Sequence, residues 1–166
     1  QPKASRSRAF LSSHGSHLLF AVLVLGVAVS GPFQKTHEVP LSPGENFSFG
    51  GYLFEYTKLR TEKKPELAIE EAVITVSKDG KRLGELTPQR RLYRNYDHPN
   101  SEVSTLFSLG DELYATIHDI EGERVQPLKV SINPMVNWVW IGSLGITLLP
   151  LLAWRTRRAQ GDHSDE

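Results

Sequence analysis

The sequence of 166 residues has no cysteine, a single methionine and no excess of charge, because 19 basic residues balance 19 acidic ones. A chain without cysteine forms no disulfide, no thiolate metal site and no cysteine nucleophile. A large basic excess would indicate nucleic-acid binding, and a large acidic excess would indicate a solvating tail. Neither is present, and we expect no nucleic-acid partner.

Charged residues are missing altogether from two windows, residues 9–34 and 130–154. Each window is about 25 residues long, and a helix needs about 20 apolar residues to cross a bilayer. We predict transmembrane helices over residues 9–33 and 134–154. The first window also fits a secretory signal peptide, because basic residues precede it and residues 27–31 could form a cleavage site.

The basic residues beside the two windows predict an orientation. They precede the first window and follow the second: Lys3, Arg6, Arg8, Arg155, Arg157 and Arg158. By the positive-inside rule, we expect residues 1–8 and 155–166 to be cytoplasmic tails and residues 34–133 to lie on the outer face of the membrane. Gly142 and Gly145 in the second window should let a neighbouring helix approach closely.

The segment between the windows is rich in strand signals. Three stretches alternate apolar and polar residues and contain a glycine turn, at Gly50-Gly51, at Asp79-Gly80 and at Glu121-Gly122. Residues 87–107 lack a continuous strand pattern and are predicted to be a long surface loop. The predicted fold class is therefore membrane α plus exported all-β, with two transmembrane helices flanking a small antiparallel β-sandwich or barrel of five or six strands.

Six histidines could carry chemistry. His37, His98, His118 and His163 show no zinc-ligand spacing and are interpreted as solvated or hydrogen-bonded side chains. His14 and His17 lie in the first apolar window, where an ionisable residue usually serves a purpose. His14 is near enough to the window's start to reach the headgroups, whereas His17 is deeper. Two hypotheses stay open for His17, a ligand to haem iron and a hydrogen bond to a neighbouring helix.

Several motifs in this order resemble the C-terminal end of a cytochrome c maturation haem lyase subunit of the CcmF type. The motifs are "SPGENFSFGGYLFEY", "SKDG" followed by "RRLY", "DELYATI" and "NPMVNWVWIGS". The resemblance runs from about Ser16 to Arg158. It implies a polytopic membrane protein that takes haem from a haem chaperone and attaches it to the CxxCH motif of apocytochrome c on the outer face.

The resemblance also implies a cofactor and partners. Family members hold a membrane haem b between histidines of two helices, and Ser16-His17-Leu18 matches the setting of one of them. His17 is therefore the candidate axial ligand of the haem iron, with its partner histidine outside this chain. The implied partners are the N-terminal part of the subunit, a haem chaperone, apocytochrome c and its thiol-handling subunits. The exported domain would act as a docking lid, with residues 90–102 as a first candidate contact surface.

The sequence departs from the family pattern in three places. The tryptophan-rich outer segment and its haem-gripping histidines are absent from this chain, Leu19 replaces a usual glycine, and residues 62–66 are the charged "EKKPE". We therefore expect part of a haem lyase complex that is not catalytic alone, either a split subunit or a fragment. The alternatives are a membrane-anchored β-domain assembly or receptor module without haem, and a haem-export subunit of another cytochrome c pathway.

Overall fold

The computed structural model describes the backbone of residues 2–96 and 98–161, and the side chains of residues 13–96 and 98–151. The chain forms two compact units, a β unit over Phe33–Pro134 and a helical unit made of the segments on either side of it. His163 and the side chains of the basic flanks lie outside the described residues.

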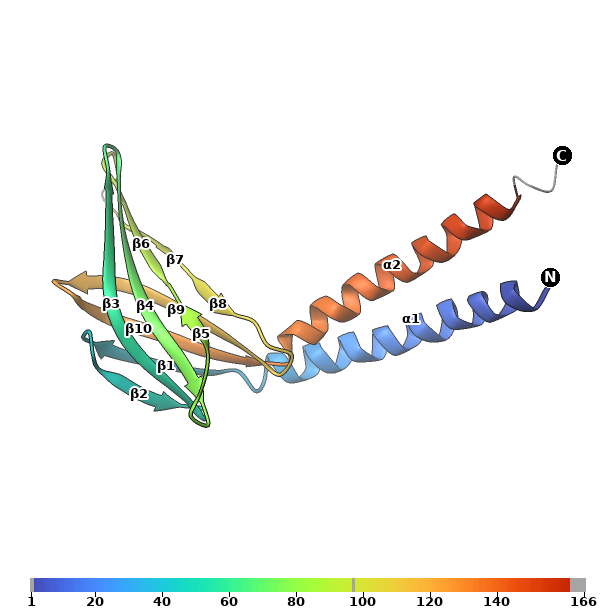
Figure 1. The fold of residues 1–166 in the computed structure, drawn as a ribbon, viewed down its shortest axis with the longest axis horizontal. Helices are drawn as coiled ribbons and strands as arrows, with labels where there is room; N and C mark the ends of the chain where they lie inside the picture. The colour runs from blue at the N-terminus through green and yellow to red at the C-terminus, as the bar shows by residue number, and fades with distance from the viewer. Residues whose placement is uncertain (1, 97, 162–166) are drawn as a thin grey trace. The chain divides into compact units, whose positions relative to one another are not determined.

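The β unit is an antiparallel sandwich of two sheets (Figure 1). The first sheet has the order β1-β10-β9-β8, and its strands are Lys35–Leu41, Arg124–Pro134, Asp111–Glu121 and Ser104–Leu106. The second has the order β2-β3-β4-β6-β7, with strands Asn46–Phe49, Tyr52–Lys64, Leu67–Lys78, Gln89–Tyr93 and Asn100–Glu102. Strand β5, Lys81–Leu86, pairs with β4 beside β6. The predicted all-β sandwich is confirmed, but the described chain has ten strands rather than five or six.

The core lies between the two sheets, and alternation along β3 shows how it is built. Side chains i and i+2 of a strand point to the same face. On β3 the inward positions are Tyr52, Phe54 and Tyr56, which are at most 5% exposed. Strands β4, β9 and β10 add the facing aliphatic side chains, with Ile74, Val76, Leu113, Ile117, Leu128 and Val130 among them. Each such side chain contributes about 1.5–3 kcal/mol when it leaves water.

The three predicted glycine turns all join strands in the structure. Asp79 and Gly80 both have positive φ, 51° and 74°, as the tight turn between β4 and β5 requires. Gly50 joins β2 to β3 with φ 59°, and a Cβ there would collide with the Ile132 side chain. Gly122, with φ 67°, lies in the turn between β9 and β10. Local turn chemistry was enough to predict these connections.

The prediction of a long surface loop over residues 87–107 is wrong in part, because this segment contains β6, β7 and β8. Strand β4 is twelve residues long, and β5 covers only its C-terminal half. The uncovered half, Leu67–Glu71, pairs with β6 from Tyr93 to Gln89. The edge left open by β5 therefore supplies the backbone partners that turn this segment into strand.

The helical unit consists of α1, Pro2–Ser30, and α2, Val136–Gly161. Close packing at Gly142 and Gly145 is confirmed within this unit. A Cβ at Gly142 would lie 2.9 Å from the Leu19 carbonyl oxygen, and one at Gly145 would lie 2.6 Å from a Leu19 methyl. Gly15 and Gly26 of α1 approach Leu149 and Val139 in the same way. Small residues on both helices thus bring the two backbones together.

One helix among the described residues is long and apolar enough to cross a membrane, Ser13–Ser30. The apolar part of α2, Val136–Leu151, is shorter than the 18 residues taken as the minimum for a membrane span. Core helices of soluble proteins and signal sequences can also be this long and this apolar. The predicted pair of transmembrane helices is therefore not confirmed by the fold.

Candidate functional site

The His17 ring is oriented by its own helix. Its Nδ1 lies 2.7 Å from the carbonyl oxygen of Ser13, one turn earlier on α1. A carbonyl oxygen only accepts, so Nδ1 carries the proton and donates. In this tautomer Nε2 keeps its lone pair, which is the state in which a neutral imidazole binds a metal. The residues present thus fit an axial ligand whose orienting partner is already in place.

His17 also lies on the side of α1 that faces away from α2. The α1 residues in contact with α2 are Gly15, Leu19, Leu23 and Gly26. With 3.6 residues per turn, position 17 lies roughly 180° around the helix from the middle of that face. The His17 side chain is accordingly exposed within this chain. Any group that it binds must come from outside the helix pair.

Leu19 lies on the α2 side of the helix, in contact with Gly142 and Gly145. Positions 17 and 19 project from nearly opposite sides of α1, so Leu19 does not lie on the His17 face. Leu19 instead fills the space that the two glycines of α2 leave open.

The other histidines that the structure describes are His14, His37, His98 and His118. His14 is exposed on α1, and His98 and His118 are exposed in the β unit. His37 stacks on Phe49 with ring centroids 5.2 Å apart. Among the residues that the structure describes, no group of three or more His, Asp or Glu side chains could hold a metal ion.

Residues 90–102, the predicted contact surface, are held by ion pairs. Arg90 lies 2.9 Å from Asp119 on β9 and 3.4 Å from Glu70 on β4, and its side chain is 15% exposed. Arg91 lies 2.7 Å from Glu102. Tyr96 is 75% exposed and meets Tyr93 edge-on, with centroids 6.1 Å apart. The two arginines are therefore already paired. Tyr96 is a large hydrophobic side chain that this segment exposes.

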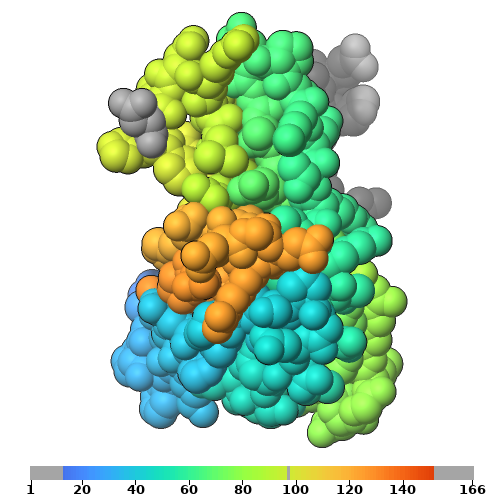
Figure 2. Space-filling view, turned by 90° about the vertical axis from the view of Figure 1, so that its left-hand side faces the viewer, coloured from blue at the N-terminus to red at the C-terminus, as the bar shows by residue number. Residues whose placement is uncertain are grey.

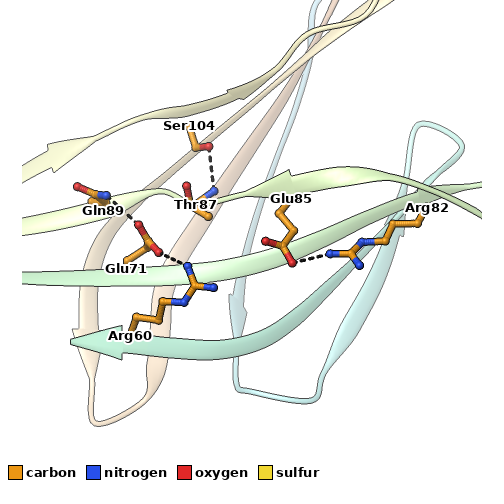
Figure 3. Close-up of polar contacts among 7 residues, drawn as sticks. All are labelled: Arg60, Glu71, Arg82, Glu85, Thr87, Gln89 and Ser104. Carbon is orange, nitrogen blue, oxygen red and sulfur yellow. Dashed lines mark hydrogen bonds and ion pairs between the residues drawn. The ribbon is translucent and has the colours of Figure 1, made fainter. Parts of the chain in front are cut away.

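A polar ladder fixes this segment to the rest of the sheet. Figure 3 shows Glu71 accepting from both Arg60, at 2.9 Å, and Gln89, at 2.8 Å. The Thr87 amide donates to the Ser104 hydroxyl at 2.8 Å, which ties the start of β6 to β8 of the other sheet (Figure 3). The backbone of β6 is thus fixed on both sides.

Figure 2 views the end of the β unit where the β9–β10 hairpin, in orange, lies in the middle. The β3–β4 hairpin and the segment from β6 to β7 lie on one side of it, and β1 and β2 lie on the other. The exposed Tyr96 belongs to the first group. The β3–β4 hairpin, the β9–β10 hairpin and the segment from β6 to β7 are therefore visible on one face of the β unit (Figure 2).

Sequence reasoning missed a polar group at the opposite end of β3. The Tyr52 hydroxyl donates to Asp111 at 2.7 Å, and the Lys78 ammonium lies 4.5 Å from the centre of the Tyr52 ring. Burial and the Asp111 carboxylate raise the pKa of Tyr52. The two hydrogen-bonded residues are 59 positions apart, so no local pattern could have paired them.

Comparisons with known proteins agree with this fold. The family described as CcmF C-terminal β-sandwich matches residues 32–134. The cytochrome c-type biogenesis protein CcmF of Pseudomonas aeruginosa is 27% identical over 154 residues, which cover 93% of this chain and 23% of that protein. The cytochrome c-type biogenesis protein NrfE of Haemophilus influenzae is 29% identical over 129 residues, covering 78% of this chain and 20% of that protein.

A solved structure named cytochrome c haem lyase CcmF has the same fold as this chain, with a TM-score of 0.73 at 19% identity. The match covers 90% of this chain and 25% of that one. The chain thus spans about a quarter of the length of the relatives that it matches. Because the family match takes in the whole β sandwich and more than half of the residues, this chain belongs to the CcmF C-terminal β-sandwich family.

Proposed function

We propose that this chain is the C-terminal part of a haem lyase subunit in cytochrome c maturation, acting with the N-terminal part of that subunit. The family match and the cytochrome c-type biogenesis proteins among its relatives support this role. The complete subunit would help to transfer haem from a haem chaperone to the CxxCH motif of apocytochrome c, beside thiol-handling partners. In this proposal the chain acts as part of a complex and does not catalyse this step alone.

His17 is our candidate for one axial ligand of a membrane haem b, and the Ser13 hydrogen bond is the observation that carries the assignment. Nε2 of His17 and a histidine outside this chain would hold the haem iron. When bound, this haem would supply a redox-active iron. The Ser13 carbonyl would keep the imidazole in one tautomer and one orientation, and would raise its basicity as a ligand.

The test is the optical spectrum of the purified subunit with all of its parts. We expect His17→Ala to lose most of the low-spin b-type absorbance and the bound haem, measured as the pyridine haemochrome. His14→Ala is the matched control, since it removes an exposed histidine from the same helix. An unchanged spectrum and haem content in His17→Ala would refute the ligand assignment.

We also propose that residues 9–33 and 134–154 cross the inner membrane, that residues 34–133 are periplasmic and that residues 1–8 and 155–166 are cytoplasmic. The apolar Ser13–Ser30 helix and the flanking basic residues support this topology. The absence of cysteine allows a clean test, because an exposed Glu123→Cys at the tip of the β9–β10 hairpin would be the single thiol. A membrane-impermeant maleimide should label it in intact spheroplasts. Labelling only after lysis would contradict the topology.

The β unit would serve as the docking domain for the haem chaperone or the apocytochrome. The exposed Tyr96 on residues 90–102 supports a contact there, since large aromatic side chains often anchor interfaces. A photo-crosslinking residue at Tyr96 should capture one of these partners in cells, and one at the exposed Lys81 should not. Equal capture at both positions would argue against this surface.

The alternative of an anchored β module without haem is favoured by one observation, the compactness of the β unit with its own core. It predicts that a polyleucine helix in place of residues 13–30, with Gly15 and Gly26 kept for their contacts with α2, preserves cytochrome c maturation. The haem-ligand proposal predicts that maturation is lost and that restoring one histidine at position 17 recovers it.

A further inference from the structure

The connection between β8 and β9, residues 107–110, exposes two large apolar side chains. Phe107 is 64% exposed and Leu109 is 63% exposed. Between them, the Ser108 hydroxyl accepts from the Asp111 amide at 3.0 Å and donates to the Asp111 carbonyl. The loop is therefore closed by its own hydrogen bonds, with an apolar side chain on either side of the closing residue.

This loop lies at the end of the sandwich where the chain enters and leaves the β unit. Asp111, the first residue of β9, is opposite Pro134, the last residue of β10. Ile132 of β10 is opposite Lys35, the first residue of β1. The β8–β9 connection therefore lies at the same end of the first sheet as both links to the helices (Figure 1). Phe33, which precedes β1, is 63% exposed.

Basic residues accompany the loop. The Tyr52 hydroxyl joins Asp111 at the loop's end to Lys78, whose ammonium lies over the Tyr52 ring. Lys81 and Arg82 follow in the same hairpin as Lys78 and are exposed, with Arg82 in an ion pair with Glu85 at 2.6 Å. Leu83 and Phe107 line one small pocket of about 120 Å³ together with Tyr52. Apolar tips beside lysine and arginine side chains are the composition of surfaces that bind anionic lipid headgroups.

We propose that Phe107 and Leu109 insert into the headgroup–acyl boundary of an anionic bilayer, with Lys78 and Lys81 of the β4–β5 hairpin at the phosphate level. This inference rests on the proposed membrane insertion of α1. In the proposed topology the chain leaves the bilayer at residue 34 and returns after residue 134, so the end of the first sheet that holds both links would lie near the lipid. Phe and Leu side chains gain free energy when they leave water for this boundary.

The experiment uses the whole chain in vesicles of phosphatidylcholine and phosphatidylglycerol. Because the natural sequence has no cysteine, a spin label can be placed singly at Phe107→Cys, Leu109→Cys, Tyr96→Cys or Val24→Cys. Tyr96 is the matched control, an aromatic residue with 75% exposure away from this edge, and Val24 of α1 reports insertion of the helix. Collision rates with oxygen and with a water-soluble nickel chelate measure the depth of each label.

We expect the labels at 107 and 109 to show a several-fold lower nickel-to-oxygen collision ratio than the label at 96. Their ratio should still be higher than that of the label at 24. Vesicles of phosphatidylcholine alone should reduce the difference. If labels 107 and 109 behave like label 96 while label 24 is in lipid, this inference is wrong and the membrane topology stands. If label 24 is in water, the topology itself fails. Equal depth in both kinds of vesicle would overturn the anionic preference.

Discussion

Two tyrosine hydroxyls of the core are bound in different ways. The Tyr56 hydroxyl donates to the Glu123 backbone carbonyl at 2.9 Å, whereas the Tyr52 hydroxyl donates to a carboxylate. Burial, and then the negative charges of Glu123 and Glu70, raise the pKa of Tyr56 to about 12. Both hydroxyls are therefore kept neutral and act as donors.

The raised pKa of Tyr56 predicts a loss of stability in alkali. The unfolded chain releases the phenolic proton near pH 10, the folded chain near pH 12. Below pH 10 both states are neutral, so the full stability is present, and it falls as the pH rises from 10 towards 12. Chemical denaturation followed by far-ultraviolet circular dichroism should show this decline.

Tyr56→Phe tests the cause of that decline. The variant lacks the bond to Glu123, and we expect it to lose on the order of 1 kcal/mol at neutral pH. It should also show a shallower loss between pH 10 and 12, because the titrating group is gone. The surface variant Tyr96→Phe is the control, and a slope in Tyr56→Phe as steep as in the natural chain would assign the alkaline loss to other groups.

At the scale of single residues, the sequence singled out His17 by its place in an apolar window. The hydrogen bond between its ring and the Ser13 carbonyl comes from the structure. The bridge from Arg90 to Asp119, which joins two sheets, could not be predicted. This bridge depends on the close approach of β6 and β9, which belong to different sheets. The sequence between them carries no periodic signal.

The two helices depend on glycine for their closest contacts. Gly142→Leu would place a branched side chain where a Cβ already lies 2.9 Å from the Leu19 carbonyl oxygen. We expect α1 and α2 to separate, at a cost of about 1–3 kcal/mol, as in other overpacked interfaces. Spin labels at the exposed positions Leu18→Cys and Leu148→Cys should then report a longer and broader distance distribution.

Gly31→Leu is the matched control, because a Cβ at Gly31 would meet nothing within 4 Å. It should leave the Leu18-to-Leu148 distance unchanged. Should Gly142→Leu leave that distance unchanged as well, the helices are held by contacts other than the glycines.

Elements with local signals were predicted, and elements that depend on distant partners were not. The Asp79-Gly80 turn and the flanking alternation define the β4–β5 hairpin on their own. Strand β6 exists because β4 extends beyond β5, which only the assembled sheet reveals. The glycines of α2 predicted a close helix but could not identify it as α1.

For the whole molecule, the β unit should fold without the helices. It has its own core, and its terminal strands β1 and β10 are hydrogen-bonded neighbours. We expect residues 33–134, expressed alone, to unfold cooperatively in urea and to give a dispersed amide spectrum. An aggregated or unstructured product would show that the sandwich needs the helical unit. The fold class of this unit was predicted from alternation, but its strand number was not.

The adjacency of β1 and β10 has a mechanical consequence. Lys35, near the start of the β unit's sequence, pairs with Ile132, near its end, and their strands are antiparallel. A lateral force that draws the attached helices apart would therefore load the β1–β10 ladder one residue pair at a time, as in unzipping, rather than shear all pairs together. The Lys35–Ile132 pair would therefore separate first, before the other residue pairs of the β1–β10 ladder.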